Sequence, residues 1–102
     1  MQVRKKKEDI KTRNEEFATD EYERITTGIK EVRDWLGISL TELSVKTQTY
    51  PSYLHRVETG QINTTVKKLI IILDALGLEL KIEPRKDLDI DKLVRDLKGQ
   101  NK

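Results

Sequence analysis

The feature that most constrains this chain is a pair of closely spaced helix starts within residues 38–58. Ser39-Leu40-Thr41-Glu42 has the pattern of a capping box, in which Ser39 accepts from the amide of Glu42 and the Glu42 carboxylate reaches back to Ser39. A second start follows at Pro51, because proline suits the first position of a helix, where its missing amide hydrogen costs nothing. The spacing predicts two short helices, over residues 40–47 and from Pro51 to a stop at Gly60.

Helices of two turns bury little surface alone, so they have to pack against further helices. Upstream, we expect a helix that is capped by Asp20 and ended by Gly37, with a start near Gly28 as the alternative. Its apolar face is predicted to contain Tyr22, Ile25, Ile29, Val32 and Leu36. Downstream, Asn63 or Thr64 is expected to cap a helix that runs through Leu76. In that helix an apolar stripe repeats at helical spacing, and Ile71 and Ile72 widen it: Val66, Leu69, Ile70, Leu73 and Leu76.

The composition narrows the class of protein. With 37% charged and 35% hydrophobic residues the core is small, and a homodimer would enlarge it by burying a shared face. The net charge of +2 is too small to indicate nucleic-acid binding by itself. The chain has no cysteine and one histidine, His55, so it offers no thiolate zinc site and no nucleophile–base pair. We therefore expect a soluble, cytoplasmic, non-enzymatic protein without cofactor, metal or membrane span.

The two ends of the chain differ from its apolar middle. Residues 1–19 are predicted to be a charged N-terminal arm, mobile or partly helical, and its basic run Arg4–Lys7 leaves contact with DNA as the alternative to a solvated tail. Residues 20–86 are predicted to form the folded domain. Residues 87–102 are predicted to be a tail or a short amphipathic helix, with a partner-binding segment as the alternative.

Leu78-Glu79-Leu80-Lys81-Ile82-Glu83 alternates between apolar and polar residues, which predicts a half-buried strand that Pro84 ends. A lone strand has an apolar face and an unpaired edge, and no second strand is visible in the sequence. Pairing with the same strand of a second copy would cover the apolar face and supply hydrogen-bond partners for the edge. We therefore predict a mostly α-helical fold of four or five helices with one C-terminal strand that pairs across a homodimer through Leu78, Leu80 and Ile82.

The central residues resemble the Xre/Cro family of helix-turn-helix proteins. The resemblance runs from about Ile29 to Leu80 and rests on these segments, in order: Gly37-Ile38-Ser39, Glu42-Leu43, Leu54, Val57-Glu58-Thr59-Gly60 and Leu73-Asp74-Ala75-Leu76-Gly77. It implies that the second short helix lies in the major groove of DNA. It also implies a structural ion pair between Arg33 and Glu58.

The resemblance assigns roles to the outward residues of the second short helix, because Leu54 and Val57 face the core. Those that correspond to base-reading positions are Pro51, Ser52 and Arg56, and a guanidinium can bind guanine bidentately. Contacts to the DNA backbone or groove edge are expected from Lys46, Thr49, Tyr50, Tyr53, His55, Lys67 and Lys68. The sequence departs from the family at Leu40, where glutamine is usual, at Thr47, where an aliphatic residue is usual, and at Gln48, where glycine is usual.

The strand after the last helix of the domain makes the chain resemble the HipB-type antitoxins. That resemblance implies a homodimeric repressor of a palindromic operator, which also binds a kinase-like toxin and represses its own operon. The alternative is a stand-alone repressor of phage or metabolic type without a toxin, and the related HigA antitoxins share the domain.

Overall fold

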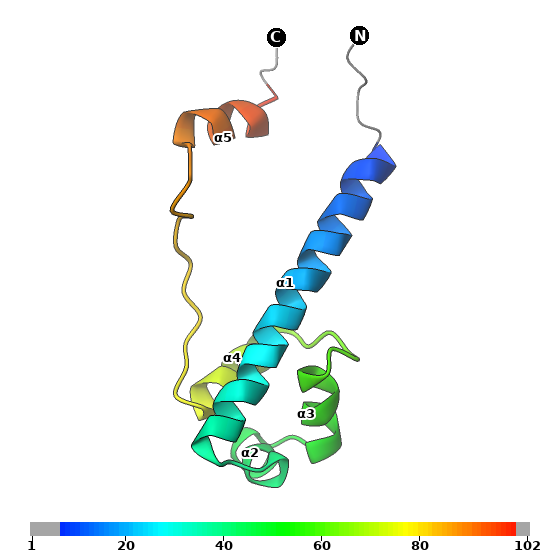
Figure 1. Ribbon diagram of the computed structural model, residues 1–102, viewed down its shortest axis with the longest axis vertical. Helices are drawn as coiled ribbons and strands as arrows, with labels where there is room; N and C mark the ends of the chain where they lie inside the picture. Colours follow the sequence, from blue (N-terminus) through cyan, green and yellow to red (C-terminus); the bar gives the residue numbers. More distant parts are fainter. Residues whose placement is uncertain (1–6, 100–102) are drawn as a thin grey trace.

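The computed structural model describes residues 7–99, and these are mostly helical (Figure 1). Five helices follow one another in this range: α1 (Lys7–Leu36), α2 (Leu40–Thr47), α3 (Pro51–Glu58), α4 (Val66–Ala75) and α5 (Ile90–Leu97). Helices α2, α3 and α4 gather around the C-terminal end of α1, and the chain then returns along α1 to α5 at the opposite end. The molecule is therefore elongated, with extents of 57 × 26 × 21 Å.

Helix α1 is longer than the sequence predicted. It begins at Lys7 and passes without a break through Asp20 and Gly28, so neither of the predicted starts is correct. The acidic residues Glu8 and Asp9 lie in its first turn, where the helix dipole favours negative charge, and the residues before Gly28 include no glycine or proline. The described part of the predicted arm is therefore helical and exposed, whereas residues 1–6 lie outside the described residues.

The predicted end of α1 and start of α2 are confirmed. Gly37 has a φ of 70°, and the amides of Gly37 and Ile38 donate to the carbonyls of Asp34 and Arg33 at 3.0 and 3.1 Å. Immediately afterwards the capping box closes, with the Glu42 amide donating to Ser39 Oγ and the Ser39 amide to Glu42 Oε1, both at 3.0 Å.

The turn between α2 and α3 accommodates two of the three departures from the family pattern, Thr47 and Gln48. Gln48 adopts the left-handed conformation at φ 54° and ψ 45°, which is why glycine is usual there. Thr47 is buried, and its hydroxyl donates to the Leu43 carbonyl at 2.8 Å, so a threonine takes the place of an aliphatic side chain without an unpaired polar group. Val45, at 75% exposed, faces solvent.

The core lies between α1, α2, α3 and α4. Its buried members are Ile29, Leu43, Leu54, Val57, Leu69, Ile72, Leu73 and Leu76. On α1, Thr26 is buried and Ile25 is exposed, so the inner face is rotated relative to the predicted one. On α4, Val66, Ile70 and Ile71 are also exposed, so only part of the predicted apolar stripe is buried in the single chain.

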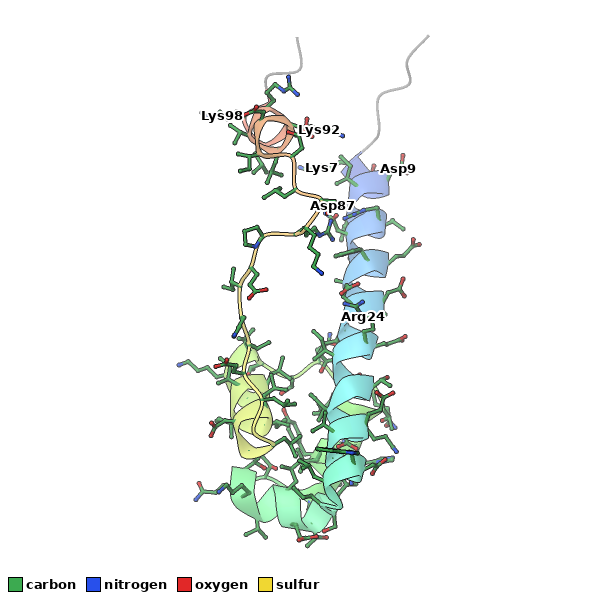
Figure 2. All side chains as sticks on the ribbon, turned by 60° about the vertical axis from the view of Figure 1, so that its left-hand side comes forward. Lys7, Asp9, Arg24, Asp87, Lys92 and Lys98 are labelled. Carbon is green, nitrogen blue, oxygen red and sulfur yellow. The ribbon has the colours of Figure 1, made fainter. Side chains whose placement is uncertain are left out.

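The C-terminal part departs further from the prediction. Thr65, rather than Asn63 or Thr64, caps α4 by accepting from the Lys68 amide at 3.2 Å. Residues 78–83 form an irregular connection, and no strand occurs in residues 7–99, since a single chain offers this segment no edge to pair with. The predicted amphipathic helix is present as α5, whose residues are all exposed. Figure 2 shows Lys92 and Lys98 of α5 at the same end of the molecule as Lys7 and Asp9 of α1.

Candidate nucleic-acid interface

Helix α3 presents one face to the core and the other to solvent. Leu54, Val57 and Glu58 are buried, whereas Ser52, His55 and Arg56 are exposed. This division follows from the helical period, since residues three and four apart share a face. Of the three residues predicted to read bases, Ser52 and Arg56 therefore lie on the free face, and Pro51 is half-buried in the first turn.

A buried ion pair connects the inner face of α3 to α1. Arg33 Nε donates to Glu58 Oε2 at 2.7 Å and Arg33 Nη2 donates to Glu58 Oε1 at 2.9 Å. The third group, Nη1, donates to the Ile38 carbonyl at 2.8 Å. The hydrogen bond with Glu58 raises the pKa of the Arg33 guanidinium and outweighs the opposite effect of burial. This two-point contact restrains how α3 is oriented on the core.

Three of the residues predicted to touch the DNA backbone lie around the turn before α3. Tyr50 occupies the N-cap position without a side-chain capping bond, and its side chain is 76% exposed. Lys46 is exposed in the last turn of α2. Thr49 is half-buried, and its hydroxyl bonds to that of Thr47 at 2.7 Å. Tyr50 and Lys46 are therefore free to contact a ligand, whereas Thr49 mainly braces the turn.

Tyr53 is held between α3 and the start of α4. Its hydroxyl forms a hydrogen bond with that of Thr64, and the ammonium of Lys68 lies 4.9 Å from the centre of its ring. The hydroxyl therefore already has a partner within the protein. Lys67 and Lys68 are both exposed in the first turn of α4.

Tyr22 is a residue whose role the sequence did not reveal. Its hydroxyl donates to the Ile62 carbonyl and accepts from the Thr64 amide, both at 3.0 Å, so α1 is tied to the connection between α3 and α4. A tyrosine within an aliphatic stripe does indicate that its hydroxyl needs a partner. The partner lies 40 residues away, however, and no local pattern identifies it.

The segment from α2 to the start of α4 is locally basic although the whole chain is nearly neutral. Its lysine and arginine residues are Lys46, Arg56, Lys67 and Lys68, and all four are exposed. Its only carboxylates are Glu42, which closes the capping box, and Glu58, which is paired with Arg33. The exposed charge of this segment is therefore net positive, as binding to a phosphate backbone requires.

The described residues 7–99 contain no group of three metal-ligating side chains. None of the helices described is long and apolar enough to cross a membrane. The arrangement is instead one of two short helices at a tight turn, with the outer face of the second free and cations on both sides of it. These features define a helix-turn-helix DNA-binding domain.

The comparison with protein families agrees with this class. A family model described as helix-turn-helix, of the Xre/Cro-like type, matches residues 29–82, which is more than half of the chain. The chain therefore belongs to this family, and it is a DNA-binding transcription regulator. The family is in general a regulatory and not an enzymatic one. Searches of curated proteins and of solved structures returned no match.

Proposed function

We propose that this protein is a sequence-specific repressor that binds a palindromic operator as a homodimer, with α3 in the major groove. The observation that carries the proposal is the division of α3: Glu58 is locked into the core by Arg33, while Arg56, two residues earlier, is exposed. An exposed guanidinium on a helix of fixed orientation is suited to bidentate binding of guanine O6 and N7.

The remaining contacts follow from exposure. Ser52 shares the outer face with Arg56 and binds a base edge, and Pro51 approaches the DNA in the first turn. The phosphate backbone is bound mainly by exposed groups before, on and after α3: Lys46, Tyr50, His55, Lys67 and Lys68. The half-buried Thr49 and Tyr53 lie at the margins of this surface. Because phosphate contacts carry no sequence information, specificity depends mainly on Arg56 and Ser52.

The dimer is supported by apolar side chains that the single chain leaves in water. Leu80 and Ile82 are 47% and 104% exposed, and Ile70 and Ile71 on α4 are about half exposed. Leu78 is half-buried against the core and anchors the start of the segment. Pairing of residues 78–83 between two copies covers these side chains and sets the two recognition helices about 34 Å apart, one turn of DNA.

A second role, as the antitoxin of a type II toxin–antitoxin module that represses its own operon, is supported by α5. All its apolar side chains and that of the preceding Leu88 are exposed: Leu88, Ile90, Leu93, Val94 and Leu97. An eight-residue helix is marginal alone, so a partner surface, here that of a kinase-like toxin, would stabilise it. The stand-alone repressor without a toxin is the other candidate.

Selection from a random-sequence duplex library tests the DNA-binding proposal. We expect enrichment of a palindrome, and an affinity that falls with salt with a log–log slope on the order of −4 or steeper. No enriched sequence and a flat salt response would reject the repressor.

For the antitoxin role, the full-length Leu93→Asp variant should fail to neutralise the toxin encoded beside it while still binding the selected duplex. A neighbouring gene without growth-arresting activity would leave the stand-alone repressor.

A further inference from the structure

The connection between α3 and α4 depends on one side chain of α1. Residues 59–65 contain no regular secondary structure. The amides of Thr59, Gly60 and Gln61 still donate to carbonyls of α3, but the Ile62 carbonyl and the Thr64 amide have no backbone partner among residues 7–99. The hydroxyl of Tyr22 supplies one acceptor and one donor, for the Thr64 amide and the Ile62 carbonyl, both at 3.0 Å. Backbone groups that are satisfied in this way hold a loop in a single conformation.

Thr64 passes this restraint to the recognition helix. While its amide donates to Tyr22, its side-chain hydroxyl bonds to the hydroxyl of Tyr53 on α3. The Tyr53 ring in turn lies 4.9 Å from the ammonium of Lys68, within the range of a cation–π contact. The contacts therefore run without a gap from Tyr22 on α1, through Thr64 and Tyr53, to Lys68 on α4.

Contact with the Tyr53 ring lowers the entropic cost of binding a phosphate through Lys68. A lysine side chain is flexible, and it loses rotamer freedom when its ammonium is fixed against a phosphate. A ring that already places the ammonium reduces this loss, provided that the ring itself is fixed. Tyr53 is fixed at its hydroxyl by Thr64, and Thr64 is fixed at its amide by Tyr22.

We propose that Tyr22 is a positioning residue of the DNA interface: through Thr64 and Tyr53, its hydroxyl sets where the Lys68 ammonium meets the phosphate backbone. The proposal rests on the assignment of Lys68 to the DNA backbone made above, and it is independent of any toxin. Tyr22 itself lies on α1 and touches no DNA.

Tyr22→Phe is the test, since it removes the hydroxyl and keeps the ring. The probe is a duplex of about 30 base pairs of arbitrary sequence, roughly three helical turns, because backbone contacts do not require an operator. We expect binding to weaken about fivefold, the effect of one hydrogen bond, and the log–log salt slope to fall in magnitude by about one. Hydrogen exchange at the Thr64 amide should accelerate in the free protein.

Thr26→Val is the matched control. Thr26 is buried one turn further along α1, and its hydroxyl donates to the Glu23 carbonyl of the same helix, so it is not connected to the loop. This variant should leave the salt slope and the exchange of the Thr64 amide unchanged. An equal loss of DNA binding in both variants would show that only general stability is involved and would overturn the proposal.

The effect has to act through Lys68, and a double-mutant cycle measures this. In a Lys68→Gln background, Tyr22→Phe should cause no further weakening. If it weakens binding as much as in the parent chain, Tyr22 does not act through Lys68 and the proposal is wrong. If Lys68→Gln alone leaves the salt slope unchanged, the assignment of Lys68 to the backbone fails first, and the proposal fails with it.

Discussion

The Arg33 guanidinium uses all of its nitrogen atoms to fix α3 and the turn before α2. Two nitrogens bind the two carboxylate oxygens of Glu58, at 2.7 and 2.9 Å, and the third binds the Ile38 carbonyl at 2.8 Å. The side chains of Arg33 and Glu58 are 9% and 3% exposed, so water cannot replace either of them as a partner of the other. The orientation of α3 therefore depends on a contact made on its buried side, opposite the exposed face that carries Ser52 and Arg56.

Removal of either partner should be strongly destabilising. Arg33→Met or Glu58→Leu leaves one buried charge without compensation, and we expect a loss of about 3–5 kcal/mol in the free energy of unfolding. The double variant, which removes both charges, should lose much less than the sum. Urea denaturation measures all three. Losses that simply add would show that the two side chains are not coupled.

The elements that the sequence predicted correctly are those fixed by short-range chemistry. The capping box at Ser39 and Glu42, Pro51 at the first position of α3 and Gly37 after α1 each depend on residues within one turn. The start of α1 was wrong because Asp20, a good capping residue, lies in a segment whose other residues also favour helix.

For the candidate site, the sequence predicted which side chains of α3 are exposed but not the contacts between distant residues. The exposure of Ser52 and Arg56 follows from the helical period once Leu54 and Val57 are assigned to the core. The bonds from Tyr22 to Ile62 and Thr64 join residues distant in the sequence, and they depend on how α1 lies against the loop. The exposed state of Ile70 and Ile71 could not be predicted either, because an apolar stripe does not tell which part faces the chain's own core.

The left-handed turn at Gln48 carries strain that glycine would relieve. The left-handed conformation costs a residue with a side chain about 1–2 kcal/mol, while glycine adds about 0.5–1 kcal/mol of entropy to the unfolded chain. We expect Gln48→Gly to raise the free energy of unfolding by about 0.5–1 kcal/mol. Gln61 is the control, because Gln48 is the only residue other than glycine with positive φ within residues 7–99. Gln61→Gly should destabilise, and equal effects at both sites would contradict the explanation.

The capping box should make stability depend on pH. The hydrogen bond from the Ser39 amide lowers the pKa of the Glu42 carboxyl below its ordinary value of 4.5. Because the folded pKa is the lower one, the stabilisation is present above pH 4.5 and is lost as the pH falls through the folded pKa. Glu42→Gln should therefore be less stable than the parent at neutral pH and equal to it in acid. Urea midpoints measured across this range would contradict the expectation if their difference stayed constant.

The proposed pairing of residues 78–83 predicts that alternate positions respond differently. Leu80→Asp places a charge on the apolar face and should produce monomers that bind DNA weakly, as measured by sedimentation and by titration of a selected duplex. Lys81 lies next to Leu80 but on the opposite face of an alternating segment, so Lys81→Ala should leave the dimer intact. An undisturbed dimer in Leu80→Asp would refute the pairing, and the loss of the dimer in both variants would show that the segment does not pair as a strand.

Arg56 should carry most of the sequence preference. Arg56→Ala removes the proposed bidentate contact to guanine, and we expect discrimination between the selected duplex and a scrambled one to fall by about 1–3 kcal/mol. The fold should be unaffected, since Arg56 is exposed and Arg33 and Glu58 remain paired. Arg24→Ala provides the control, because Arg24 is an exposed arginine of α1 that pairs only with Glu21 at the surface and its loss removes the same charge. If the two variants lose the same affinity for both duplexes, Arg56 contributes charge alone, and the reading of bases has to be assigned to Ser52 and its neighbours on α3.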